Sequence, residues 1–186
     1  ARVNQPGSVG EAMAAAIDAL RAIRVDSPRL DAELLMSEAA GLDRAQLVAR
    51  PETPLAGAAG RRFAEMVRRR HAEFITALAE QADLAFFLPH GERLTAHLRV
   101  HAANIATALA WLERQGDVDG MSRIVCALPR FWTQSGSLDE GRWWLERAVA
   151  LGRAAGSPWL GKVLIALGSQ AHMKGEEALA LAYCRE

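Results

Sequence analysis

The sequence predicts an all-α protein. Alanine and leucine dominate, and apolar residues recur at spacings of three and four. No segment alternates apolar and polar residues in a β-rich composition. Capping boxes, Ser-Pro pairs and glycines divide this pattern into about nine helices.

The N-terminal part predicts three helices with distinct start and stop signals. Ser8-Val9-Gly10-Glu11 has the form of a capping box and begins the first helix. Ser27-Pro28 begins the second, with serine as the cap and proline in the first turn, and Gly41 ends it. Asp43 caps a short third helix, which ends before the rigid break Pro51-Glu52-Thr53-Pro54.

Three longer helices are expected next. The first runs from about Leu55 to Leu84 and stops at Leu88-Pro89-His90-Gly91. The second spans about Glu92 to Gln115, and the third runs from about Asp117 to Gln134, with Gly116 between them.

The last three helices also begin at recognisable signals. Ser137-Leu138-Asp139-Glu140 has the form of a second capping box. Ser157-Pro158 begins the next helix, which reaches about Met173, and the last begins near Gly175.

An internal repeat covers part of these helices. Arg123–Leu128 matches Lys162–Leu167 position by position, and Gly136 and Gly175 follow the two segments at the same distance, 39 residues apart. A helical hairpin buries its apolar face only against a neighbour, so this pattern predicts stacked hairpins.

Composition and charge restrict the class of protein. Hydrophobic residues make up 51% and charged residues 24%, which is typical of a soluble globular protein. The 22 basic and 22 acidic residues cancel, so neither a nucleic acid nor a membrane is an expected partner. The N-terminus has no secretion signal, and Cys126 and Cys184 are expected to be reduced thiols, so we expect a cytoplasmic protein.

The segment VDSPRLDAELLMSEAAGLDRAQLVARPETPL, Val25 to Leu55, resembles a known domain. Ser27 to Leu35, Gly41 to Arg44, and the prolines at 51 and 54 carry the resemblance to the N-terminal helical domain of release-factor glutamine methyltransferases (the HemK/PrmC family). The resemblance covers about residues 8–69 and implies a small bundle that helps to dock the release factor. The Gly-rich loop and the Asn-Pro-Pro-Tyr motif of that family's catalytic domain are absent, so we expect neither methyltransferase activity nor a cofactor.

The rest of the sequence resembles a different family. Asn104 to Trp111, Phe131-Trp132 and Gly141 to Glu146 are similar to the tetratricopeptide-like region of large bacterial transcriptional regulators. This resemblance covers about residues 70–186 and implies stacked helical hairpins that relay ligand or partner binding. The ATPase and DNA-binding modules of those regulators are absent from the sequence.

The two resemblances meet inside one predicted helix, so we expect a domain of residues 1–69 and a domain of residues 70–186. A continuous helix through Arg69–His71 requires both parts to agree in helical phase, which a linker would not require. Together with the start at Ala1 and the end at Glu186, this favours an engineered chimera of natural helical segments with no selected activity and no native location. The alternative is a natural interaction module of a bacterial regulator, which binds a peptide or a partner helix.

The most conspicuous candidate site is aromatic. Trp132, Trp143 and Trp144 crowd around one turn, where they could form a hot spot for a partner. Large rings more often hold two helices together, so we expect most of this cluster in the core, with one of Trp143 and Trp144 exposed.

The other candidate groups of residues do not make up a metal site or a catalytic site. His97 and His101 are four apart on one helix face, but a zinc site needs further ligands, and nothing in the sequence places His71 or His90 beside them. No motif sets a nucleophile beside a base, so we expect no enzyme, no metal and no cofactor. The last helix is expected to leave apolar residues uncovered, which favours self-association; these residues are Leu179, Leu181 and Tyr183.

Overall fold

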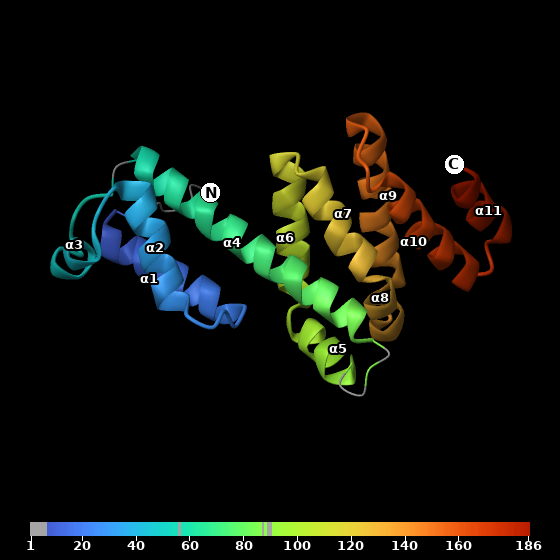
Figure 1. Cartoon of the computed structure of the whole chain (residues 1–186), viewed down its shortest axis with the longest axis horizontal. Coiled ribbons are helices and arrows are strands. Elements are labelled where there is room, and N and C mark those ends of the chain that lie inside the picture. Colours follow the sequence, from blue (N-terminus) through green and yellow to red (C-terminus); the bar gives the residue numbers. More distant parts are fainter. Residues whose placement is uncertain (1–6, 56, 87, 89–90) are drawn as a thin grey trace. The chain divides into compact units, whose positions relative to one another are not determined.

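The computed structural model describes residues 7–55, 57–86, 88 and 91–186. These residues form eleven helices and no strand (Figure 1), so the predicted all-α class is confirmed. The chain divides into two compact units, Ala1–Phe74 (unit 1) and Ile75–Glu186 (unit 2).

Unit 1 contains three helices and the first part of a fourth. They are α1 (Val9–Ala22), α2 (Pro28–Ala40), α3 (Arg44–Ala49) and the N-terminal portion of α4 (Gly57–Leu84). α2 packs on both α1 and α3. Large buried apolar side chains of the unit come from all four helices and the turn after α1 and include Leu20, Ile23, Met36, Leu47, Phe63 and Val67.

The predicted caps of unit 1 form with two differences. At α3 the capping box is complete: Asp43 accepts from the amide of Gln46 at 2.8 Å, and the Gln46 side chain accepts from the amide of Asp43 at 2.9 Å. At α1 the Glu11 carboxylate reaches one residue further back than expected and accepts from Gly7 N at 2.8 Å. Ser27 makes no side-chain bond to α2, so that part of the prediction was wrong, although Pro28 occupies the first turn as expected.

Helix α4 is continuous from Gly57 to Leu84, as the sequence predicts. The division between the units falls within this helix, between Phe74 and Ile75. Each part of α4 is tied to a helix of its own unit. Arg70 donates to Asp31 of α2 at 2.8 Å, and Glu80 accepts from Arg123, which lies in unit 2.

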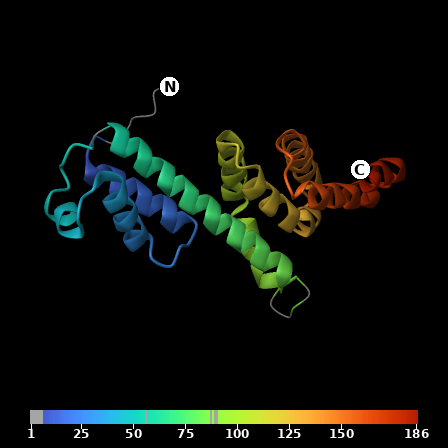
Figure 2. The ribbon, with the colours of Figure 1, turned by 45° about the horizontal axis from the view of Figure 1, so that its top comes forward.

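Unit 2 contains the rest of α4 and seven further helices. Of these, α6, α7, α9, α10 and α11 follow one another in a row in chain order (Figures 1 and 2). Helices α6, α7, α9, α10 and α11 pack on one another in that order, while α8 packs on α9 and α5 on α8. The bounds of the helices are α5 Gly91–Val100, α6 Ala102–Gln115, α7 Val118–Ala127, α8 Pro129–Ser135, α9 Leu138–Ala155, α10 Leu160–Met173 and α11 Glu177–Arg185.

Two of the predicted helices are each broken in two, so the described residues form eleven helices instead of about nine. The helix expected over Asp117–Gln134 ends at Ala127, with Leu128 as its C-cap, because Pro129 has no amide hydrogen to continue the helix and starts α8 instead. The capping box expected at Ser137 does not form, since Ser137 makes no side-chain bond to α9.

The helix expected over Glu92–Gln115 breaks at His101, where the sequence has neither glycine nor proline. His101 is fully buried, with its Nδ1 3.1 Å from the Asn104 amide nitrogen and its Nε2 3.2 Å from His97 Nε2. The break allows α5 to pack on α8 while α6 packs on α7. Tertiary packing therefore overrides the helical pattern at this residue.

Candidate functional site

A hollow with a volume of about 980 Å³ lies within unit 2. We call it the unit 2 groove. The end of α4, together with α7, α8 and α10, supplies most of its walls. Its lining residues include Glu80, Asp83, Leu84, Phe86, Arg123, Cys126, Arg130, Thr133, Gln134, Trp159, Lys162, Ile165, Ser169 and Met173.

One face of α10 forms a wall of the groove. Lys162, Ile165, Ser169 and Met173 follow one another at spacings of three and four and are all exposed. Ile165 is 63% exposed and Met173 is 51% exposed, although both are large apolar side chains. The opposite face of α10 holds the buried residues Val163, Leu164 and Leu167. The helix therefore presents an apolar and basic stripe that no described part of unit 2 covers.

The facing wall, on α7 and α8, uses equivalent positions of the internal repeat. Arg123, Cys126, Arg130 and Gln134 stand 39 residues before the four stripe residues of α10, and all of them line the groove. The buried positions of the repeat also agree, since Ile124, Val125 and Leu128 match Val163, Leu164 and Leu167. The glycines that end the two segments, Gly136 and Gly175, have φ values of 75° and 74°. Two successive helical segments thus turn the same face toward the groove.

Both acidic side chains of the groove are paired with arginines. Glu80 accepts two hydrogen bonds from Arg123, at 2.8 and 2.9 Å, in a bidentate pair that joins α4 to α7. Asp83 accepts from Arg130 Nη1 at 2.6 Å, and the Arg130 guanidinium lies 5.0 Å from the centre of the Phe86 ring. These pairs neutralise both carboxylates within the groove itself.

Lys162 is held differently from the two arginines. Its ammonium lies 4.4 Å from the centre of the Trp159 ring, within range of a cation–π contact. Among the described residues, no carboxylate lies within 4.0 Å of it. The groove therefore carries one cation whose charge is not matched by a neighbouring acid.

Cys126 lies on the α7 wall of the groove and is partly buried. Burial raises the pKa of its thiol from the ordinary value of 9.0 to about 11, while the charge of Lys162 acts in the opposite direction. The thiol is therefore neutral near physiological pH, and it contributes a polarisable apolar surface instead of a nucleophile.

The three tryptophans singled out in the sequence do not share one surface. Trp132 and Trp144 are buried, at 1% and 6% exposure, and Trp143 is 54% exposed. The rings of Trp143 and Trp144 meet edge to face with their centres 4.5 Å apart. Trp132 also lines a smaller hollow of about 310 Å³. The burial of two of the rings indicates a packing role, and a partner-binding role for the cluster stays a prediction.

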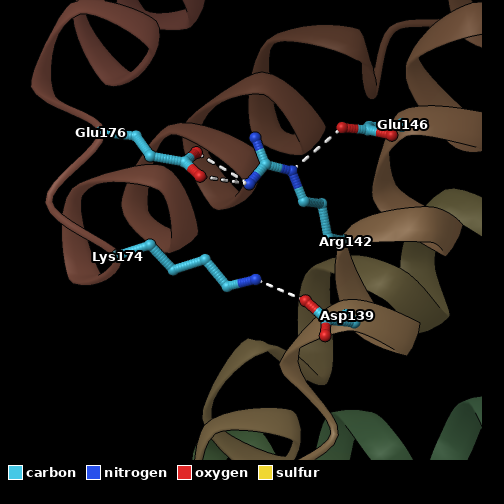
Figure 3. Close-up of polar contacts among 5 residues, drawn as sticks. All are labelled: Asp139, Arg142, Glu146, Lys174 and Glu176. Carbon is cyan, nitrogen blue, oxygen red and sulfur yellow. Dashed lines mark hydrogen bonds and ion pairs between the residues drawn. The ribbon is translucent and has the colours of Figure 1, made fainter.

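A polar network joins α9 to the turn before α11 (Figure 3). Arg142 donates to Glu146 on its own helix at 3.1 Å and to Glu176 at 2.9 Å. These two hydrogen bonds raise the pKa of the Arg142 guanidinium. Lys174 pairs with Asp139, and its hydrogen bond lowers the pKa of that carboxyl. The network therefore ties the segment between α10 and α11 to α9.

The histidines do not form part of a larger cluster in the described ranges. His97 and His101 have their rings 4.8 Å apart, but no group of three or more His, Cys, Asp or Glu residues there is placed to hold a metal ion. His90 lies outside the described residues. In the same ranges no helix is both long enough and apolar enough to cross a lipid bilayer.

The apolar residues expected at the last helix are partly covered. Leu181 is 53% exposed, while Leu179 and Tyr183 are half-buried. α11 approaches α10 closely at Gly168, where an added Cβ would lie 3.4 Å from the Ala180 carbonyl oxygen and 3.3 Å from the Cys184 sulfur. Self-association through this helix stays a prediction.

The tryptophan prediction missed the residues of the unit 2 groove. The internal repeat held the signal, because it assigns Lys162 and Ile165 to the same positions as Arg123 and Cys126. An apolar Ile165 on the polar side of an amphipathic helix was a further sign of an uncovered contact surface.

Comparison with known proteins gives one match, and it concerns unit 1. Residues 11–74 match the family model of the PrmC N-terminal domain, which supports the resemblance to a helical domain of that methyltransferase family. The match covers less than half of the chain and ends at Phe74, where unit 1 ends. No curated protein and no solved structure matches the chain. The chain is thus similar to the PrmC N-terminal domain over unit 1.

Proposed function

We propose that this chain is a non-catalytic helical protein and that unit 2 binds a segment of a partner protein in the unit 2 groove. The observation that carries the proposal is the exposed stripe on α10, opposite the equivalent positions on α7 and α8. The stripe consists of Lys162, Ile165, Ser169 and Met173. The resemblance of this part of the sequence to tetratricopeptide-like repeats agrees with it, because such stacks present a surface built from successive hairpins.

Two features of the groove support a binding role over a catalytic one. The thiol in the groove is neutral, and its two carboxylates are paired with arginines. The exposed apolar side chains and the ion pairs of the groove agree with a binding role. Apolar side chains at the centre of a contact and paired charges at its rim are typical of protein interfaces.

A selection experiment tests this function. A phage-displayed peptide library is panned on the whole chain, and the affinity of the selected peptides is measured by fluorescence anisotropy. Ile165→Glu places a charge in the groove and is expected to weaken binding by about tenfold or more, equivalent to about 1.4 kcal/mol.

Val100→Glu is the matched control, because Val100 is 64% exposed in unit 2 and does not line the groove. It is expected to leave the affinity unchanged. Failure to select any peptide, or selected peptides that bind both variants like the wild type, would contradict the proposal.

We also propose that the two units have separate origins and were joined by design within α4. The supporting observation is that the family match and unit 1 both end at Phe74. A genome that encodes residues 1–186 as one reading frame would contradict a designed junction. Calorimetric detection of S-adenosylmethionine binding would contradict the non-catalytic assignment.

A further inference from the structure

We infer that the segment bound in the unit 2 groove is an amphipathic helix with acidic side chains beside its apolar stripe. The inference rests on the proposed function, since it names the chemistry of the partner for the same site. Three features of the groove support it: its unmatched charge, its uncovered apolar side chains and its shortage of neutral polar side chains.

The charges in the groove indicate the sign of the charge that the partner carries. Glu80 and Asp83 are each satisfied by an arginine, so a basic partner would have to break an existing pair. Lys162 has no carboxylate within 4.0 Å in the described part of the chain and sits on the Trp159 ring. A carboxylate from a partner would match this cation without displacing a bond of the free protein.

The apolar contact surface lies next to this cation. Ile165 is one helical turn beyond Lys162 on the same face of α10, and Met173 continues the row. Leu84, at the end of α4, is 80% exposed and also lines the groove. A partner that covers these three side chains removes large apolar area from water, which favours binding.

The polar composition of the groove favours a helix over an extended peptide. An extended segment leaves its backbone N–H and C=O groups to be paired by the binding site, whereas a helix pairs its own. Among the described lining residues, the hydroxyl and amide side chains are those of Thr133, Gln134 and Ser169, and the Thr133 hydroxyl already donates to the Pro129 carbonyl. The exposed row at spacings of three and four is also the surface into which a second helix packs.

The test uses stapled helical peptides of about four turns, acetylated and amidated so that every carboxylate belongs to a side chain. One peptide has Leu at the positions of one face and Glu beside them. A second has Gln in place of Glu, a third has Lys, and a fourth has the composition of the first with d-Pro residues that prevent a helix. Binding to the full chain is followed by fluorescence anisotropy at low and high salt.

The Glu peptide is expected to bind about three- to tenfold more tightly than the Gln peptide, with a preference that falls at high salt. The Lys and d-Pro peptides are expected to bind more weakly than either. Lys162→Glu is expected to reverse the order, so that the Lys peptide binds best. Arg114→Glu makes the same charge change at an exposed residue outside the groove and is expected to preserve the order.

The outcomes separate this inference from the proposed function. Equal binding of the Glu and Gln peptides, with no effect of Lys162→Glu, would overturn the acidic partner. Equal binding of the helical and d-Pro peptides would overturn the helical partner. In both cases Ile165→Glu would still weaken binding, so the groove itself would stand. If none of the peptides binds and library selection also fails, both proposals are wrong.

Discussion

Gly141 lies directly against the indole ring of Trp132. A Cβ added at Gly141 would come within 2.5 Å of Trp132 Cδ2 and 2.6 Å of Cε3. Trp132 is 1% exposed, so its ring has no solvent into which it could move. The absence of a side chain at this position of α9 therefore allows the close packing of α8 on α9.

Gly141→Ala is accordingly expected to destabilise the protein by about 1–3 kcal/mol, because overpacking outweighs the gain in helix propensity. Gly161→Ala is the control, since Gly161 also lies in a helix and has nothing within 4 Å of an added Cβ. It is expected to stabilise the protein by up to about 1 kcal/mol. Urea unfolding followed by circular dichroism measures both, and equal effects would contradict the packing argument.

Gly136 and Gly175 occupy equivalent positions of the repeat with positive φ. Each has nothing within 4 Å of an added Cβ, so replacement by alanine introduces conformational strain without a steric contact. We expect Gly136→Ala and Gly175→Ala each to cost about 1–2 kcal/mol. Asparagine tolerates this conformation better and should cost less at both positions. A large difference between the two sites in urea unfolding would contradict their equivalence.

Arg142→Leu removes the donor that joins α9 to Glu176. The side chain of Arg142 is 21% exposed, and its loss leaves the Glu176 carboxylate without this partner. We expect the amides of α11 to exchange faster with deuterium, in keeping with a local loss of roughly 1–2 kcal/mol. Asp139→Asn breaks the neighbouring surface pair with Lys174 and should leave the exchange of α11 nearly unchanged, since the Asp139 side chain is 93% exposed. Equal exchange in the two variants would refute a special role for Arg142.

Cys126 makes the free energy of unfolding of the protein depend on pH in the alkaline range. Burial raises its pKa to about 11 from 9.0, so the folded state retains the thiol proton longer than the unfolded state. The stabilisation from the neutral thiol is complete below pH 9.0 and is lost as the pH rises toward about 11. Urea unfolding between these pH values should show that the free energy of unfolding falls more steeply with pH in the wild type than in Cys126→Ala. Cys184→Ala, which changes an exposed thiol, should keep the steep loss; identical slopes in all three proteins would contradict this account.

Local signals predicted the helices where those signals decide the backbone. Gly41 ends α2 with φ of 68°, and Asp43 and Gln46 form the expected box, because each of these effects involves residues within one turn. The break at Pro129 also has a local signal, because proline cannot continue the hydrogen bonding of α7 and starts α8 instead. The break at His101 has no local signal, since it depends on a buried imidazole and on what α5 and α6 pack against.

The candidate site was harder to predict than the fold for a physical reason. The repeat indicates which residues of α7 and α10 are equivalent, but burial depends on which neighbours cover each face. Trp132 and Ile165 illustrate this point. The site predicted from the sequence includes Trp132, which is buried, and does not include Ile165, which is 63% exposed. Exposure of a large apolar side chain is a property of the tertiary structure.

Because the two walls of the groove are equivalent, the groove can be lengthened by adding copies of the repeat. Since the wall residues recur every 39 residues, the length of the groove is proportional to the number of hairpins in the row. Duplicating residues 118–156 would add a third wall with the same register of arginine, cysteine, arginine and glutamine. The partner segment that unit 2 accommodates could then be lengthened in whole modules, while the packing within each hairpin stays the same.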